Sequence, residues 1–458
     1  MTSASGADAR TIAELGAAFR ARRLSPVEAT QGCLQRIAEL DPALHAFITV
    51  TGDLALEQAR TAAAELAAGH DRGPLHGVPV ALKDLIDTAG TRTTGGSALF
   101  EDRIPTQDAE VVRRLRAAGA VLLGKLNLHE LAYGGSGVIG HYPASRNPRN
   151  PAHITGGSSS GSAAAVAAGM CYAALGSDTS GSIRLPAALC GIVGFMPSYG
   201  LVSLRGVIPL SSSYDHVGPM TQTVRDAALV LQAIAGYDPD DITSAVLPVP
   251  DYAAALDGPG PRLRVGVARP YFFAELDAEV AAAVERALGV LADLGAELRD
   301  IDLPVDDDRT VFRAESYAFH RPWVERCPER YQPETLRRIR TGATVSAAEY
   351  IEKWQHLQHL RRGAAAQFAE VDLIVTPTVP VAAPSFADIE AQPETLRPRE
   401  LVMMRNTRPF DIWATPTLSV PCGVTRAGLP IGFQIAGRIG ADAGVLRLGA
   451  ALERALAS

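Results

Sequence analysis

The sequence predicts an α/β fold in which helices cover a β-sheet. Helical hydrophobic periods alternate along the chain with short apolar runs typical of buried strands. The composition is that of a globular protein, with 47% hydrophobic and 20% charged residues. Length alone, 458 residues, would suggest roughly three domains. Because the sequence contains no internal repeat and no low-complexity linker, we instead expect one domain over residues 1–458.

The first part of the chain, residues 1–70, is predicted to be helical. Apolar residues recur at three- and four-residue spacings over residues 11–69, and Ser25-Pro26 is typical of an N-cap followed by the first helical residue. Residues 73–82 begin with glycines and prolines and then become apolar, which indicates a strand that enters the core.

The later elements alternate in the same way. We expect strands at 120–123, 263–268 and 373–376, and helices at 108–118 and 279–294. Residues 305–368 are rich in arginine and aromatic residues and are predicted to form a helical insert. We expect this insert to lie on the substrate side.

Charge and hydropathy exclude several functional classes. The net charge is −7 and no run of five basic residues occurs, which argues against nucleic acid or an anionic membrane as partner. The longest strictly apolar run, residues 163–176, is shorter than the ~20 residues that span a bilayer. Residues 1–10 lack the pattern of a signal peptide, and the five cysteines are dispersed. We therefore expect a cytoplasmic protein with reduced thiols.

Three motif matches lack the structural context that their chemistry requires. Residues 135–140 fit a dinucleotide-binding GxGxxG motif but precede His-Tyr-Pro rather than a helix. Residues 119–125 fit a phosphate-binding loop, but Leu126 replaces the hydroxyl residue. Residues 157–161 fit the GxSxG nucleophile motif without the strand that should precede it. No histidine or cysteine spacing indicates a metal site, so we expect neither a metal nor a cofactor.

Two Gly/Ser-rich turns are more informative. Residues 155–162 and 176–182 flank a stretch of small residues that is long enough for a helix followed by a short strand. Close packing through alanine and glycine would bring the two turns together. Successive backbone N–H groups in the second turn could bind an anion, as an oxyanion hole requires. The alternative is that both turns are flexible polar loops.

Lys83 is one of three lysines, with Lys125 and Lys353, among 43 basic residues. It follows the apolar run 78–82, and burial there would lower its pKa and make it a candidate base. A salt bridge to Asp84 or to another acidic residue is an equally open alternative.

Together these segments resemble the amidase signature family of serine hydrolases. The matching stretches are GVPVALKDLIDTAGTRTTGGS (77–97), ITGGSSSGSAAAVAAG (154–169) and GSDTSGSIRLPAALCGIVGFMPSYG (176–200). The resemblance implies a central mixed β-sheet covered by helices on both faces. It also implies a Ser–cis-Ser–Lys triad of Ser182, Ser158 and Lys83, in which the peptide Gly157–Ser158 is cis.

Further roles follow from the same resemblance. The backbone N–H groups of Thr179, Ser180, Gly181 and Ser182 would hold the oxyanion, and Asp178 and Arg184 would support the nucleophile turn. Independently of the resemblance, Tyr133, Gly134, Gly135 and Trp413 are candidates to line an apolar substrate pocket, and packing in the core is the alternative for the two aromatic residues.

The implied activity is hydrolysis of a small amide through a seryl acyl-enzyme. We expect an uncharged or aryl amide, and carbamates (urethanes) and esters are further candidates. Ser180, Leu185 and the segment 196–198 depart from the pattern of the tRNA amidotransferase subunits, which favours a stand-alone amidase. The alternatives are the glutaminase subunit of a tRNA-dependent amidotransferase and an inactive binding protein on the same fold. The sequence leaves monomer and homodimer open.

Overall fold

The computed structural model describes residues 11–257 and 263–457. The expectations for residues 1–10 therefore lie outside the described part of the chain. The strands are β1 (Phe47–Val50), β2 (Pro79–Lys83), β3 (Val121–Leu126), β4 (Ala173–Asp178), β5 (Val193–Met196), β6 (His216–Thr221), β7 (Arg264–Ala268), β8 (Glu297–Ile301), β9 (Leu373–Pro377), β10 (Thr417–Val424) and β11 (Pro430–Gly437).

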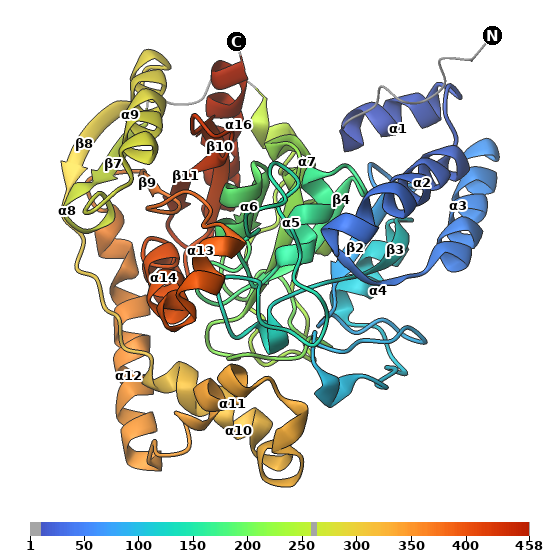
Figure 1. Ribbon diagram of the computed structural model, residues 1–458. Helices are drawn as coiled ribbons and strands as arrows, with labels where there is room; N and C mark the ends of the chain where they lie inside the picture. Colours follow the sequence, from blue (N-terminus) through green and yellow to red (C-terminus); the bar gives the residue numbers. More distant parts are fainter. Residues whose placement is uncertain (1–10, 258–262, 458) are drawn as a thin grey trace.

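The helices alternate with these strands (Figure 1). The α-helices are α1 (Ile12–Arg20), α2 (Pro26–Leu44), α3 (Gly52–Ala67), α4 (Glu110–Ala117), α5 (Ser160–Ala167), α6 (Arg184–Cys190), α7 (Val224–Ile234), α8 (Arg269–Phe272), α9 (Ala278–Asp293), α10 (Thr310–Arg326), α11 (Pro333–Arg340), α12 (Ala347–Gly363), α13 (Phe386–Ala391), α14 (Leu396–Met403), α15 (Arg408–Ile412) and α16 (Asp442–Ala457). The 3₁₀ helices are η1 (Ala98–Phe100), η2 (Glu130–Ala132), η3 (Ala254–Leu256), η4 (Pro328–Arg330), η5 (Ala364–Phe368) and η6 (Pro393–Thr395).

The described residues form one mixed sheet of eleven strands, in the order β1-β3-β2-β4-β6-β5-β10-β11-β9-β7-β8. Strand β2 pairs in parallel with β3 and β4, and β7 pairs in parallel with β8 and β9. The remaining neighbours are antiparallel. The predicted α/β fold with a central mixed sheet is therefore confirmed.

Helices cover both faces of the sheet. Successive side chains of a strand point to opposite faces, so one strand can contribute to an apolar cluster on either side. Val80 and Leu82 of β2 join the apolar cluster that includes α7 and α16, whereas Ala81 joins the cluster that includes α5. Lys83 follows Ala81 by two residues, so it lies on the α5 side of the sheet.

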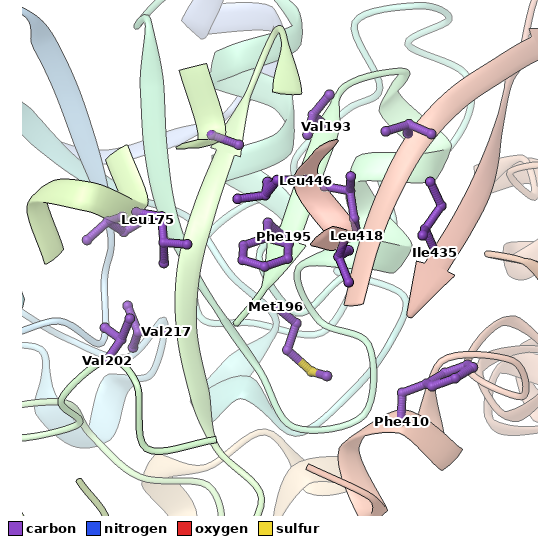
Figure 2. Close-up of a cluster of buried hydrophobic side chains, with 14 of the residues drawn as sticks. Leu175, Val193, Phe195, Met196, Val202, Val217, Phe410, Leu418, Ile435 and Leu446 are labelled. Carbon is purple, nitrogen blue, oxygen red and sulfur yellow. The ribbon is translucent and has the colours of Figure 1, made fainter. Parts of the chain in front are cut away.

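The centre of the larger cluster lies between β5, β10 and α16. Phe195 is fully buried there, and Figure 2 shows it beside Leu418 and Leu446. Members of this cluster come from both ends of the described chain, from Ile12 to Leu452. On this ground we retain the single domain as a proposal.

The N-terminal part differs from the all-helical expectation. Ser25 caps α2 as predicted, since its hydroxyl accepts the N–H of Glu28 while the Glu28 carboxylate accepts the N–H of Ser25. Residues 47–50, however, form the edge strand β1, which pairs with β3. This pairing joins residues about 75 positions apart, which local periodicity does not report.

The first predicted strand is shorter than expected. It begins at Pro79 rather than at residue 73, because residues 73–78 form a turn in which Val78 N donates to Leu75 O and Gly77 has a φ of +81°. The segment 305–368 contains α10, α11, α12 and η5, at one end of the molecule (Figure 1). No helix in the described ranges has the length and apolar character that crossing a membrane would require.

Packing of α5 against the sheet predicts the result of a glycine substitution. A Cβ atom at Gly161 would lie 2.3 Å from Ala46 O and 2.5 Å from Asn127 N. We expect Gly161→Ala to lower the free energy of unfolding by roughly 1–3 kcal/mol, because backbone must move to accommodate the methyl group. Thermal unfolding measures the change.

Gly289→Ala is the matched control. Gly289 lies inside α9 with no atom within 4 Å of its added Cβ, so alanine should raise stability by about 0.5–1 kcal/mol. A Gly161→Ala variant that unfolds at or above the wild-type temperature would contradict the packing described for α5.

Candidate active site

The two Gly/Ser-rich turns lie side by side, as the sequence predicts. Helix α5 follows the first turn and β4 leads into the second. Ser159 Oγ donates to Ser177 O at 3.2 Å, and Ser159 N donates to Ser182 O at 3.2 Å. The turns are thus fixed by direct hydrogen bonds rather than being flexible loops.

Lys83 ends β2 and is completely buried. Its Nζ donates to Ser158 Oγ at 2.7 Å and to Ser177 Oγ at 2.8 Å. No carboxylate of the described chain lies within ion-pair distance of Nζ. Asp84 pairs instead with Lys125, at 3.4 Å, so the expected alternative of a Lys83–Asp84 salt bridge is wrong.

Ser177 is a contact of Lys83 that the sequence analysis missed. Parallel pairing of Leu82 with Leu175 places the ends of β2 and β4 next to each other. The register between β2 and β4 is a property of the assembled sheet. The local sequence around Ser177 does not indicate it.

Burial lowers the pKa of Lys83 to about 7, against the opposing charges of Asp178 and Asp215. A substantial fraction of this lysine is therefore neutral at neutral pH and can accept a proton. Asp215 is itself buried, which raises its pKa to about 7, and it accepts a hydrogen bond from Thr179 Oγ1 at 2.6 Å.

The turn that carries Ser182 is organised around Asp178. Its carboxylate accepts the N–H of Gly181 at 2.5 Å and of Ile183 at 3.1 Å. The Gly181 amide is therefore occupied, which corrects the expectation that it faces an oxyanion. In the described structure the N–H groups of Thr179, Ser180 and Ser182 have no acceptor and remain available.

Gly181 is required by the shape of this turn. Its φ is +114°, and a Cβ atom would lie 2.0 Å from Thr407 Oγ1. The Thr407 hydroxyl donates to Ser180 O at 2.7 Å, so the C-terminal part of the chain closes over the turn.

Arg184 holds Asp178 in its ionised form. The guanidinium donates to Asp178 through Nε at 3.0 Å and to Asp411 through Nη2 at 2.6 Å, and all three side chains are buried. Burial by itself opposes ionisation, but the Arg184 charge holds the pKa of Asp178 well below its usual range. Burial, followed by the charge of Asp178, raises the pKa of Asp411 well above its usual value.

A glycine-rich loop supports Ser158 from the other side. The peptide Gly157–Ser158 is cis, as the resemblance implies. Gly157 N donates to Gly135 O at 2.8 Å, and His129 N donates to Ser158 O at 3.0 Å. Gly135 therefore contacts the serine turn.

A small cavity, of about 20 Å³, opens at Ser182. Among the residues expected to contact substrate, Tyr133 and Gly134 line it, whereas Gly135 does not. The lining residues are Ala132, Tyr133, Gly134, Thr179, Ser180, Ser182, Leu210, Arg309, Phe312, Arg397 and Met404. Within the described ranges, no group of three or more His, Cys, Asp or Glu side chains could hold a metal ion.

Trp413 does not belong to this cavity. It is buried in the core, edge-to-face with Phe410 at a ring separation of 5.5 Å. Arg309, Phe312 and Arg397 line the cavity instead, and the sequence analysis missed all three. They are brought to Ser182 from more than 120 residues away, and no local motif marks them.

Comparison with known proteins agrees with this geometry. The model of the family described as Amidase matches residues 28–446. The A subunit of glutamyl-tRNA(Gln) amidotransferase of Roseiflexus sp. (strain RS-1) is 41% identical to the chain over 472 residues, covering 97% of this chain and 96% of the relative.

Two solved structures are similar over almost the whole chain. Native peptide amidase from Stenotrophomonas maltophilia superposes with a TM-score of 0.83 at 33% identity, covering 99% of this chain and 98% of its own. The A subunit of glutamyl-tRNA(Gln) amidotransferase from Thermotoga maritima superposes with a TM-score of 0.80 at 34% identity, covering 98% of this chain and 96% of its own.

The Arg184 network predicts a large loss of stability on its removal. Arg184→Met would leave Asp178 and Asp411 buried without their cation, which should cost about 3–5 kcal/mol. Thermal unfolding measures this loss. Arg337→Met is the control, because the Arg337–Glu334 pair is exposed and should contribute at most about 1 kcal/mol. Equal effects of the two substitutions would contradict the role given to Arg184.

Proposed function

The chain belongs to the amidase family and is a hydrolase of carbon–nitrogen bonds, and on this premise we propose that it forms an acyl-enzyme on Ser182. The observation that carries the proposal is the 2.7 Å contact between Ser158 Oγ and Lys83, a buried lysine whose pKa is about 7. A neutral amine in contact with a serine hydroxyl is the arrangement that general-base catalysis needs.

The proposed reaction is acyl transfer. Neutral Lys83 accepts the proton of Ser158, and Ser158 accepts the proton of Ser182 as Ser182 Oγ attacks the amide carbonyl. The C–N bond then breaks while Ser158 gives a proton to the leaving amine and takes one from protonated Lys83, which becomes neutral again. A water molecule hydrolyses the acyl-enzyme by the same proton path. No cofactor takes part in this scheme.

Developing negative charge on the carbonyl oxygen needs fixed donors. We assign this role to the N–H groups of Thr179, Ser180 and Ser182, three residues that line the cavity and whose amides have no acceptor in the described structure. Asp178 fixes the turn by holding the Gly181 amide.

The proposed substrates are small amides. The cavity at Ser182 has a volume of only about 20 Å³, close to that of one water-sized group. The same acyl-transfer chemistry extends to carbamates, including urethanes, and to esters.

A second candidate concerns the assembly in which the chain works. The curated relative with 41% identity is the A subunit of a glutamyl-tRNA(Gln) amidotransferase, which favours the subunit role over the stand-alone enzyme expected from the sequence. Purification of the tagged chain from its native cells separates the two. An amidotransferase component would copurify with stoichiometric partners and show glutaminase activity that depends on them, whereas a stand-alone enzyme would hydrolyse amides alone.

The sequence departures from the amidotransferase pattern carry less weight than expected. Leu185 and Met196 are fully buried in apolar clusters, so packing accounts for both side chains. Ser198 donates to Asp442 at 2.6 Å in a buried contact away from the cavity. Ser180 alone among these residues lines the cavity.

Ser182→Ala is expected to abolish both labelling by a fluorophosphonate and hydrolysis of p-nitroanilides, primary amides, aryl carbamates and p-nitrophenyl esters. The variant lacks the nucleophilic oxygen but keeps the backbone of the turn. Ser162→Ala is the control, since the Ser162 hydroxyl donates to Leu175 O in the interior of the fold. Wild-type hydrolysis by Ser182→Ala would refute the assignment of the nucleophile.

The pKa of Lys83 predicts the pH dependence of kcat/KM. Below about pH 7 the lysine becomes protonated and cannot act as a base, so kcat/KM should fall about tenfold per pH unit. Lys83→Arg should lose activity at every pH, because arginine remains charged.

Asp215 titrates in the same pH range as Lys83. A second variant therefore shows which of the two groups produces the acid limb of the pH profile. Asp215→Asn removes a negative charge that raises the pKa of Lys83, and the acid limb should therefore shift to lower pH. Disappearance of the acid limb in Asp215→Asn would assign the titration to Asp215 and contradict the role of Lys83.

A further inference from the structure

Arg309 reaches from the helical insert to the turn that carries Ser182. It immediately precedes α10 and lines the cavity. Its Nη2 donates to Ser180 Oγ at 2.8 Å, and its guanidinium carbon lies 4.4 Å from the ring centre of Phe312. The Ser180 hydroxyl in turn donates to Thr179 O at 2.7 Å. These contacts fix the charged group beside the nucleophile turn.

The charge of Arg309 is not neutralised by the protein. No carboxylate of the described residues lies within 4 Å of its guanidinium nitrogens, in contrast to Arg184 with its two aspartates. Burial, together with the like charges of Arg408 and Arg397, lowers the pKa of Arg309 to about 9. The side chain therefore remains charged at neutral pH without a counter-ion.

Arg397 adds further positive charge to the same wall. It pairs with Glu400 at 3.1 Å, but the Glu400 carboxylate also binds Arg338 at 2.8 Å. Glu400 is thus shared between two guanidinium groups, and Arg338 also pairs with Glu334 at 2.8 Å. The residues that line the cavity include two arginines and no aspartate or glutamate.

We propose that Arg309, with Arg397 as a second cation, binds a carboxylate of the substrate, so that the enzyme acts on small amides with net negative charge. This inference rests on the proposed function, because it places the carboxylate beside a reactive Ser182. It replaces the uncharged or aryl amide expected from the sequence. The charged side chains that line this cavity are both cations, which disfavours zwitterionic amides and therefore the glutaminase candidate.

Ser180 acts as a positioning residue in this proposal. Its hydroxyl oxygen accepts the Arg309 hydrogen bond and thereby holds the guanidinium over the cavity. Arg309 could alternatively serve only to tether the insert to the turn, and the experiment below separates binding of an anion from tethering.

Three primary amides of one chain length isolate the effect of charge. Glutaramate carries a carboxylate, pentanamide replaces that group by a methyl group, and L-glutamine adds an α-ammonium group to glutaramate. Ammonia release by the wild-type protein gives kcat/KM for each. We expect glutaramate to exceed both other amides by about 10- to 100-fold, the range of a charge-assisted hydrogen bond.

Arg309→Met should lower kcat/KM for glutaramate by about 10- to 100-fold and leave pentanamide within about threefold. Arg321→Met is the matched control, because it removes one exposed positive charge from the same helix and should change neither value. An equal loss on both amides in Arg309→Met would show tethering alone and overturn the proposal. Equal wild-type rates on glutaramate and pentanamide would exclude a carboxylate site on the acyl side, and a preference for glutamine would overturn the proposal.

A carboxylate on the leaving group is tested with 4-(butanoylamino)benzoate against butyranilide. A preference for the former that Arg309→Met abolishes places the anion on the amine side, whereas a preference confined to glutaramate places it on the acyl side. Absence of both preferences counts against the proposal.

A direct binding measurement tests the anion site independently of the proposed catalytic function. Calorimetric titration with glutarate should give binding to the wild type and to Arg321→Met, and a loss of at least about tenfold in affinity in Arg309→Met. Absence of glutarate binding, with Ser182 labelled by a fluorophosphonate, overturns the anion site alone. Failure of Ser182 to react overturns the proposed function.

Discussion

The ion pair between Arg184 and Asp178 is the interaction on which the site depends. It lies where β4 ends and α6 begins, and its second carboxylate, Asp411, comes from the C-terminal part of the chain. Because all three groups are buried, the charges of Arg184 and Asp178 are compensated by each other rather than by water. The ionised Asp178 can therefore hold the Gly181 amide, which sets the conformation of the turn that presents Ser182.

The sheet also buries a lysine away from solvent and from any counter-ion of the described chain, which is the second condition for the proposed catalysis. Parallel β2 and β4 end at the same edge, so Lys83 meets Ser158 and Ser177 rather than solvent. The two buried lysines of this region have different partners. Lys125 is paired with Asp84, whereas Lys83 contacts only hydroxyl groups at hydrogen-bonding distance, which explains why burial brings its pKa near neutrality.

Much of this arrangement could be predicted from the sequence, because it depends on local signals. The serine turns, the small residues between them and the apolar run before Lys83 are contiguous segments, and the family resemblance that they carry implies their roles. Ser177, Arg309 and the edge strand β1 could not be found in this way, since strand register and long-range contacts position them. Trp413 shows the converse error: an aromatic residue named as a substrate contact packs in the core instead of lining the cavity.

The central claim is that acyl transfer passes through Ser182, and trapping the acyl group tests it most directly. The wild-type protein would be mixed with a p-nitrophenyl ester, quenched in acid within the first turnover, digested, and analysed by tandem mass spectrometry. We predict an acyl group on Ser182, and on no other serine of residues 155–182. An acyl group on Ser158 or Ser180, or turnover without any acylated residue, would contradict it.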